Sequence, residues 1–460
     1  MKKIAFFCIP AHGHTNPMLP VAAALVRRGN RVRFYSFDMF AEKIKATGAE
    51  FVSCDRFLLE LTKREEASMK RVSTTEMTIQ DIRFTINTDA FIDREFESFQ
   101  PDVVYTDSVC FWGKLNAWKH KVPMVVSTST FAFNRMSSQY MKNSPREIFD
   151  MVTGLPRLSK ELKKLEPYGY CIKNPLTLVQ SDNSTDSVVY ASPLFQPFSE
   201  SFSKHYAFVG PSVFSDKQPD KSAARPLVYI SMGTVINDRP DFYKTCIAAL
   251  KDMPVEVIIS CGSAVDRDSL GTLPENIQVF PYVNQLDVLS RASVFISHCG
   301  MNSVSESLYM AAPLVLFPQT NEQKAVARRV SELNAGVMLK DASEDGIRDA
   351  VSEILDNPAY ADAARRCRED FRACGGAERA AEFIESAPHS DDGVDVFKEL
   401  DRFTSRFNLI YWIVYAAAML LIRSRYSWLI LPFAIALNIW LGGKVSNLRY
   451  AALVKKIKKK

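Results

Sequence analysis

The chain has 460 residues, a length that predicts two or three domains. Its 47% hydrophobic and 24% charged residues exclude collagen-like, disordered and disulfide-scaffold proteins. The net charge of +5 is unevenly distributed: residues 402–460 hold 11 basic and no acidic residues, which leaves 46 basic against 52 acidic residues in 1–401. The basic character therefore belongs to the C-terminal segment, where it predicts an anionic membrane surface as partner and not nucleic acid.

The cysteines predict a reducing compartment. There are nine, an odd number, scattered and without a Cys-x-x-Cys pair.

The apolar run at 4–9 is followed at once by histidines, with no cleavage site of small residues. It is expected to be a strand and not a signal peptide. With six histidines and no Cys or carboxylate at ligand spacing, we expect neither a bound metal nor another cofactor.

Strand-like runs alternate with helical patterns over residues 1–385, as in βαβ units of a parallel sheet. In chain order, the first half is expected to contain a strand at 4–10, a helix at 19–28, strands at 31–37 and 102–105, a helix at 111–120 and a strand at 123–127. The second half is expected to contain strands at 227–231 and 255–260 around a helix at 241–253, then a strand at 294–297, a helix at 303–311 and a strand at 313–317. The predicted fold class is α/β.

Composition divides the chain further. A polar, proline-flanked linker is expected at 216–226, between an N-terminal domain at 1–215 and a C-terminal domain at 227–385. A second linker is expected at 386–406. Phe and Met are dense at 57–99 and 131–151, where they form either core or, as a group, an adaptable apolar pocket.

Two apolar runs at 407–422 and 428–441 predict a membrane-associated helical hairpin at 407–442, followed by a basic tail at 443–460. As helices these runs reach only about 24 and 21 Å, against ~30 Å of bilayer hydrocarbon. Crossing the membrane and a re-entrant or interfacial hairpin both remain open, and a buried core hairpin is the third alternative. We expect the cell membrane as location, with the catalytic domains on the cytoplasmic side.

Two histidines follow the first predicted strand, where loops at the carboxyl edge of a parallel sheet gather ligands. His14 is suited to take a proton from a hydroxyl group, and it needs a carboxylate to orient it. Asp107 ends another predicted strand and is the candidate partner. For His12, a binding role and a plain loop hydrogen bond are equally compatible with the sequence.

The second constellation is a strand, tight turn and helix at 297–306. Such a junction presents unpaired N–H groups and the positive end of the helix dipole to a phosphate. Gly300 permits close approach of the backbone and His298 can donate to the anion. The alternative is a capping box, with Ser303 as N-cap and Glu306 three residues later.

Taken together, these motifs resemble nucleotide-sugar glycosyltransferases of the UDP-glycosyltransferase superfamily, of the bacterial macrolide-glycosyltransferase type. The resemblance covers residues 1 to about 385. It rests on Gly13-His14-Thr15-Asn16-Pro17, Ser231-Met232-Gly233-Thr234, Tyr282-Val283-Asn284-Gln285, His298-Cys299-Gly300-Met301-Asn302-Ser303 with Glu306, Pro313, and Pro318 followed by Glu322-Gln323.

The resemblance implies a GT-B fold, in which two Rossmann-like domains face a cleft, the first holding the acceptor and the second the donor. It implies an inverting enzyme with His14 as general base and Asp107 as its orienting partner. The donor-binding residues implied are Thr234, Tyr282, Val283, Gln285, His298, Gly300, Asn302, Ser303, Glu306, Glu322 and Gln323. The implied co-substrate is a nucleotide sugar, with UDP the expected nucleotide and a hexose the expected sugar.

This sequence departs from the family pattern at four places. Tyr282 stands where Trp is common, Asn284 where Pro is common, Met301 where plant members have Trp and Glu322 where Asp is frequent. The choice of nucleotide and of sugar therefore stays open. A lipophilic or lipid acceptor is expected from the predicted tether and from the Phe and Met content. The alternative function is a membrane-tethered scaffold that binds nucleotide sugars without turnover.

Overall fold

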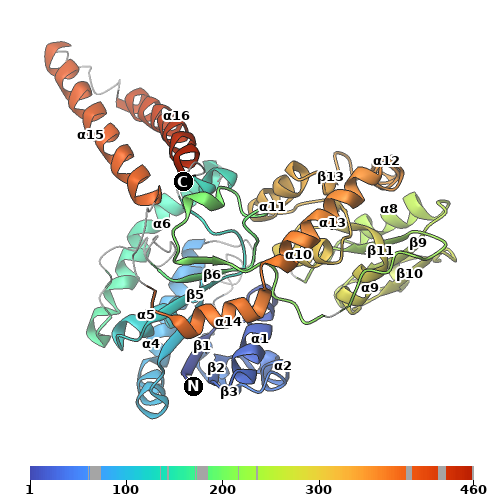
Figure 1. Ribbon diagram of the computed structural model, residues 1–460, viewed down its shortest axis with the longest axis horizontal. Helices are drawn as coiled ribbons and strands as arrows, with labels where there is room; N and C mark the ends of the chain where they lie inside the picture. The colour runs from blue at the N-terminus through green and yellow to red at the C-terminus, as the bar shows by residue number, and fades with distance from the viewer. Residues whose placement is uncertain are drawn as a thin grey trace.

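The computed structural model describes residues 1–60, 62, 74–134, 136–141, 145–170, 172, 185–215, 217–234, 237–389, 396–422 and 431–457. Over these ranges the chain builds two α/β halves and a projecting pair of helices (Figure 1).

Within the described residues, the sheet of the first half has seven parallel strands in the order β3-β2-β1-β4-β5-β6-β7. The strands are β1 (Lys3–Phe7), β2 (Arg31–Ser36), β3 (Glu50–Ser53), β4 (Val103–Asp107), β5 (Met124–Thr128), β6 (Ser187–Val189) and β7 (Tyr206–Phe208). The order reverses between β1 and β4, and a sheet of this kind opens a crevice for ligands at that point of its carboxyl edge.

The sheet of the second half repeats this plan, with six parallel strands among its described residues in the order β10-β9-β8-β11-β12-β13. They are β8 (Leu227–Ser231), β9 (Glu256–Ser260), β10 (Ile277–Phe280), β11 (Ala292–Ser297), β12 (Leu314–Leu316) and β13 (Gly336–Met338). The reversal between β8 and β11 gives this half a corresponding crevice. Apolar clusters cover both faces of each sheet.

The helices of the two halves are α1 (His12–Arg27), α2 (Ala41–Lys45), α4 (Thr74–Phe99), α5 (Phe111–Lys119), α6 (Pro145–Lys163), α8 (Pro240–Leu250), α9 (Gln285–Arg291), α10 (Met301–Tyr309), α11 (Asn321–Glu332), α12 (Glu344–Asp356), α13 (Pro358–Ala373) and α14 (Gly376–Ser386). Helix α1 begins seven residues before the helix expected at 19–28. The carbonyl of extended Ala11 accepts the N–H groups of His14 and Thr15 at 3.1 and 2.9 Å and so starts the helix early.

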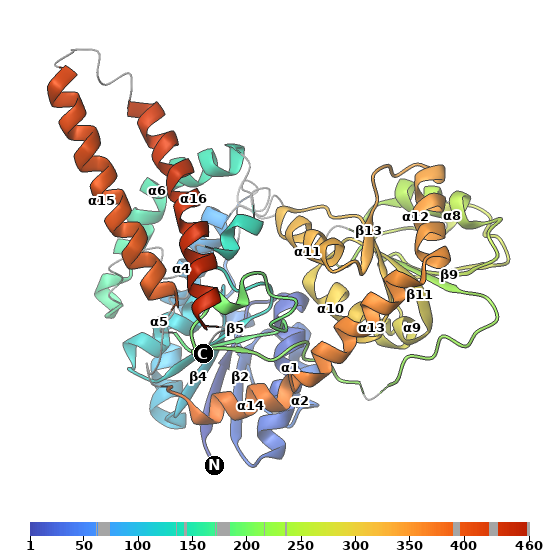
Figure 2. The same cartoon turned by 45° about the horizontal axis from the view of Figure 1, so that its top comes forward.

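Helix α14 belongs to the first half, although the C-terminal domain was expected to run to residue 385. Its apolar residues Ala380, Ala381, Phe383 and Ile384 pack in the same cluster as β1 and α1. Figures 1 and 2 show α13 leading from the second half and α14 lying across the first. The sequence pattern missed this because a helix carries the same periodicity whichever sheet it covers.

The C-terminal helices are α15 (Val396–Ile422) and α16 (Leu431–Ile457), and they pack against each other. Both exceed the expected hairpin at 407–442: α15 takes in part of the expected linker at 386–406, and α16 takes in most of the expected tail at 443–460. Apolar residues continue at helical spacing there, as at 396, 400 and 403, which explains the added turns. The expected turn between them lies outside the described residues.

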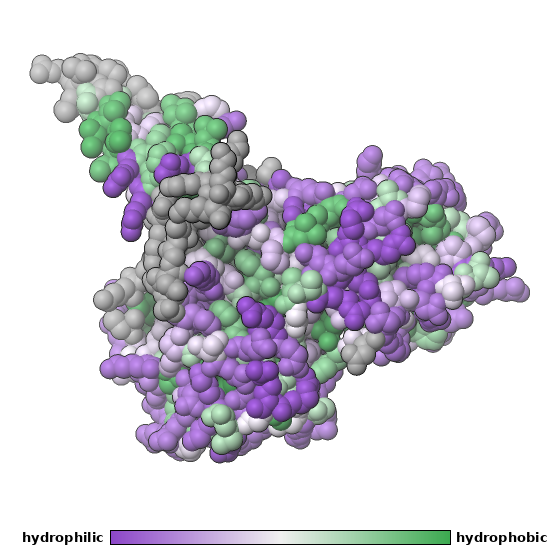
Figure 3. Space-filling view, viewed as in Figure 1, coloured by the Kyte–Doolittle hydropathy of each residue, from purple (hydrophilic) through white to green (hydrophobic). Residues whose placement is uncertain are grey.

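We call α15 and α16 the arm. Figure 2 shows it projecting from the first half, and Figure 3 shows apolar side chains gathered on its described surface. In the described parts of the chain, no helix combines the length and the apolar character needed to cross a membrane. The membrane-crossing alternative for the expected hairpin is therefore not supported.

The Phe- and Met-rich segments lie largely in α4, α6 and the segment after β5. Phe84, Phe131 and Met136 are buried, as the core alternative expects, while Met77 and Phe91 are half-buried. Part of this set lies outside the described residues, Met69 among it.

Candidate active site

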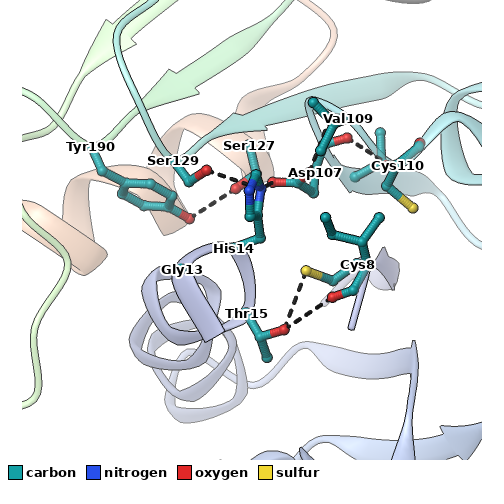
Figure 4. A network of polar contacts seen from close by, with 12 residues as sticks. Cys8, Gly13, His14, Thr15, Asp107, Val109, Cys110, Ser127, Ser129 and Tyr190 are labelled. Carbon is teal, nitrogen blue, oxygen red and sulfur yellow. Dashed lines mark hydrogen bonds and ion pairs between the residues drawn. The ribbon is translucent and has the colours of Figure 1, made fainter. Parts of the chain in front are cut away.

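His14 and Asp107 meet at the carboxyl edge of the first sheet, where the strand order reverses. The Nδ1 atom of His14 lies 2.8 Å from Oδ2 of Asp107 (Figure 4). Asp107 ends β4 and is fully buried, and its Oδ1 accepts the backbone N–H of Val109 at 3.0 Å. The carboxylate thus occupies Nδ1 and leaves Nε2, across the ring, as the nitrogen that can take a proton.

Ser129 is a third member of this cluster that sequence reasoning missed. Its Oγ lies 3.1 Å from Nδ1 of His14, on the opposite side from Asp107 (Figure 4). Ser129 directly follows β5, the neighbour of β4, so the strand-edge argument that selected Asp107 could also have selected it.

The surroundings of His14 change its basicity. Burial lowers its pKa, but the charge and hydrogen bond of Asp107, with the charge of Glu322, outweigh burial and raise the pKa above its usual value. Glu322 comes from the second half, so both halves contribute to the electrostatics of one imidazole. The ring of His12 instead packs edge-on against Phe40, with centroids 4.9 Å apart.

The second constellation surrounds the ring of His298, which follows β11. A Cβ atom added at Gly233 or at Gly300 would lie 2.5 Å from Nε2 of His298, so both glycines leave the space that this ring occupies. Nδ1 of His298 is buried and has no hydrogen-bond partner among the described residues. Burial lowers the pKa of His298 to about 4, so the imidazole is neutral at pH 7.

Gly300 is the N-cap of α10, and no side chain caps this helix end. Ser303 lies inside the helix, so the capping-box alternative is wrong. The first N–H groups of α10 stay available beside His298, an arrangement that suits an anion.

Asn302 connects the two halves. Its Nδ2 donates to the backbone carbonyl of Gly13 at 3.0 Å, next to His14. Figure 4 shows Gly13 and His14 together in the first turn of α1. A cavity at this junction is lined by Asn16, Pro17, Tyr190, Pro211, Ser212, Val213, Asn302, Ser305 and Glu306. The two predicted groups of site residues therefore face each other across one junction.

A short polar chain lies beside α10. Nε2 of Gln285 donates to Glu306 at 2.7 Å and lies 3.4 Å from Oγ of Ser303, and Oε1 of Gln285 accepts the hydroxyl of Tyr229 at 3.2 Å. Burial raises the pKa of Glu306 to about 7, against the hydrogen bond from Gln285, which lowers it. A carboxylate held in this way can accept hydrogen bonds from a diol.

The remaining predicted donor residues lie in the second half. Thr234 is exposed in the turn after β8, the side chain of Tyr282 is 65% exposed, and Val283 packs on the core of the second half. Glu322 is exposed at the start of α11. Gln323 has a structural role that the sequence analysis missed: its Oε1 accepts the N–H groups of Gln319 and Thr320, closing a capping box with Thr320.

No three His, Cys, Asp or Glu side chains within the described residues gather as metal ligands. The arrangement supplies a histidine oriented by a carboxylate on one side of the junction. On the other side it supplies an uncapped helix start, a neutral histidine and a half-buried carboxyl group. It can therefore combine proton removal from a hydroxyl with binding of an anionic group.

The model of the family described as "UDP-glucoronosyl and UDP-glucosyl transferase" matches residues 215–368. The chain is 32% identical over 394 residues to the NDP-glycosyltransferase YjiC of Bacillus licheniformis, covering 84% of this chain and 97% of that protein. It is 29% identical over 398 residues to the demethyllactenocin mycarosyltransferase of Streptomyces fradiae, covering 84% and 86%. The crystal structure of the kitacinnamycin glycotransferase has a TM-score of 0.70 at 27% identity, covering 84% and 98%.

These matches and the two facing parallel sheets confirm the predicted GT-B fold. The chain belongs to the UDP-glycosyltransferase family and is related to bacterial macrolide glycosyltransferases. It is accordingly a glycosyltransferase that moves sugar from a nucleotide-sugar donor to a small-molecule acceptor.

Proposed function

We propose that the protein is an inverting, UDP-dependent hexosyltransferase that glycosylates a hydroxyl group of a lipophilic acceptor. The observation that carries the mechanism is the 2.8 Å contact between His14 and Asp107. His14 Nε2 removes the acceptor proton while the oxygen attacks the anomeric carbon, and the bond to the UDP oxygen breaks in the same in-line step. One displacement inverts the anomeric centre, and Asp107 stabilises the imidazolium that forms.

The leaving diphosphate would lie at the start of α10. The free N–H groups at Gly300–Ser303, with His298 and Thr234, would stabilise the developing negative charge. Asn302 would leave its bond to Gly13 to contact the diphosphate. Glu306 would accept the ribose hydroxyls, Tyr282, Val283 and Gln285 would frame uracil and ribose, and Glu322 with Gln323 would contact the sugar.

The direct test uses purified protein, UDP-sugars, a TDP-sugar and membrane lipid extract, with products identified by mass spectrometry. The mass of a single product would assign both the sugar and the acceptor class. NMR of donor and product would show whether the anomeric configuration is inverted, from α to β or from β to α. If neither transfer nor slow donor hydrolysis occurs with any nucleotide, the alternative of a nucleotide-sugar-binding scaffold without turnover is favoured.

The proposed mechanism uses no metal or other cofactor, because protein donors stabilise the diphosphate. Transfer should therefore proceed at an unchanged rate after EDTA treatment and show no stimulation by Mg²⁺ or Mn²⁺. The measurement is the initial rate before and after chelation, with a metal-dependent transferase as positive control. A loss that Mg²⁺ restores would contradict the assignment.

We also propose that the arm lies in the interface of an anionic membrane, with the catalytic halves on the cytoplasmic side of the cell membrane. Support comes from exposed apolar side chains on the arm, at 63% for Leu409, 62% for Val414 and 60% for Trp440. The net charge of residues 402–460 adds attraction to anionic lipids. A lipophilic acceptor would reach the first half from this surface.

Ile413→Asp should weaken binding to phosphatidylglycerol-containing vesicles by about tenfold or more, because a carboxylate then enters the apolar boundary. The matched control is Met39→Asp, since Met39 is 58% exposed and Ile413 59%, but Met39 lies on the first half. Vesicle co-sedimentation measures the binding of each variant and of the wild type. Equal binding by the two variants and the wild type would exclude the arm as anchor.

A further inference from the structure

The segment Leu194–Phe198 is a joint between the two halves and the arm. Arg329 of α11 donates to the backbone carbonyl of Phe195 at 3.2 Å and also to that of Leu194. The buried ring of Phe195 lies between Phe131 of the first half and Phe371 of α13, at 5.5 Å from each centroid. The segment is therefore packed against the second half by both polar and apolar contacts.

Phe198 extends this joint to the arm. Its ring contacts edge-on both Tyr140, with centroids 6.0 Å apart, and Tyr450 of α16, with centroids 5.5 Å apart. The backbone of Phe198 has a φ of +55°, a conformation that a bulky residue adopts only when its surroundings require it. The strained residue is thus the one that joins two aromatic contacts.

Tyr140 carries the connection to α11. Its hydroxyl donates to Glu332, and the guanidinium of Arg328 lies 4.2 Å from the centroid of its ring. Both partners are on α11, whose first turn holds Glu322 and the capping residue Gln323. A continuous set of contacts therefore runs from α16 through Phe198 and Tyr140 to the helix that begins at the active site.

The end of α16 is fixed on this joint. The hydroxyl of Tyr450 donates to Glu200 at 3.2 Å, and Leu453 is buried against Met136. A buried contact of 3.1 Å between the hydroxyls of Thr404 and Ser446 holds α15 to α16 near the same place. We call this end of the arm its foot. It meets the catalytic body through specific side chains, unlike the apolar outer part.

We propose that Tyr450 is a positioning residue for the donor site: the foot of the arm, through Phe198 and Tyr140, holds α11 in the orientation that binds the nucleotide sugar. The inference rests on the proposed function in one respect, that Glu322 and Gln323 face the donor. Tyr450 itself touches no substrate, and its effect is on the placement of α11. A helix that contributes charge to His14 from the opposite half must be held at a fixed distance, and the foot supplies one of its supports.

The test compares the full-length wild type with Tyr450→Ala, Tyr450→Phe and Trp440→Ala. We expect Tyr450→Ala to weaken binding of the UDP-sugar donor, measured by calorimetry, and to raise the donor KM by about three- to tenfold with little change in kcat, because the residues that α11 contributes are proposed to contact the sugar. Tyr450→Phe keeps the ring contact with Phe198 and should retain most of the affinity. Trp440→Ala, on the outer part of the arm, should bind the UDP-sugar as the wild type does.

Hydrogen exchange of the backbone of α11 is measured in the same variants without nucleotide. Faster exchange over Asn321–Glu332 in Tyr450→Ala, with an unchanged melting temperature, supports the positioning role. Unchanged exchange in a folded Tyr450→Ala overturns it, as does wild-type affinity for the UDP-sugar. If the wild type binds no UDP-sugar, the proposed donor is wrong, and the exchange measurement alone decides the coupling. Should Tyr450→Ala not fold, Tyr450→Leu takes its place.

Discussion

His14→Ala should reduce sugar transfer by about 10²- to 10⁴-fold, the range for loss of a general base, while UDP binds with nearly wild-type affinity. Catalysis should be lost without loss of UDP binding because the imidazole is held by Asp107 in the first half, whereas the predicted nucleotide contacts lie in the second half. Initial rates by mass spectrometry and UDP affinity by calorimetry measure the two effects. Full activity of the variant would refute the role of His14.

Asp107→Asn is the companion experiment, since it keeps the shape of the side chain and removes its charge. The charge and hydrogen bond of Asp107 raise the pKa of His14, so their loss should lower that pKa. A general base works when neutral, and kcat/KM falls as the pH drops through its pKa. The acid limb of the profile should thus move to lower pH, while the maximal rate falls because the imidazolium has lost its partner.

Gly233→Ala should weaken donor binding by about tenfold or more. Gly233 has a φ of +78°, where a Cβ costs roughly 1–2 kcal/mol, and this Cβ would also lie 2.5 Å from Nε2 of His298. The ring has to move away from the start of α10, where the diphosphate is proposed to bind. UDP affinity by calorimetry checks the result.

Gly29→Ala separates displacement of the His298 ring from backbone strain. Gly29 lies at the C-terminal end of α1 with a φ of +85°, close to that of Gly233, but an added Cβ there would meet no atom within 4 Å. It should lose a similar amount of stability in thermal unfolding and keep its affinity for UDP. Equal loss of affinity in both variants would mean that strain alone, and not the position of His298, weakens binding.

Much of the fold was predictable because parallel strands leave a strong local pattern. The strand at 227–231 agrees with β8 residue for residue, and the two polar clusters were expected where the strands end. His14 and Asp107 could be paired from sequence because adjacent parallel strands bring their carboxyl ends to one edge. The same reasoning reaches Ser129, which follows the next strand along.

The contacts between the halves could not be predicted from periodicity. The bond from Asn302 to Gly13 spans 289 positions in the sequence, and no local pattern records it. Gln323 shows a different limit, since a glutamine near a helix start is equally suited to a sugar contact and to a capping box. Only the positions of Gln319 and Thr320 show that its side chain closes the cap.

Because α14 returns the chain to the first half before the arm begins, the two halves would stand in different relations to a bilayer at the proposed membrane location. The half proposed to take the acceptor carries the arm. Among the described contacts, the half proposed to take the donor is connected to the arm through Phe198 and Tyr140 of the first half. A water-soluble nucleotide sugar would then bind from the aqueous phase. The lipophilic acceptor would arrive by lateral diffusion in the bilayer. The two reactants would approach one cleft from two phases, and neither would have to leave the phase in which it dissolves.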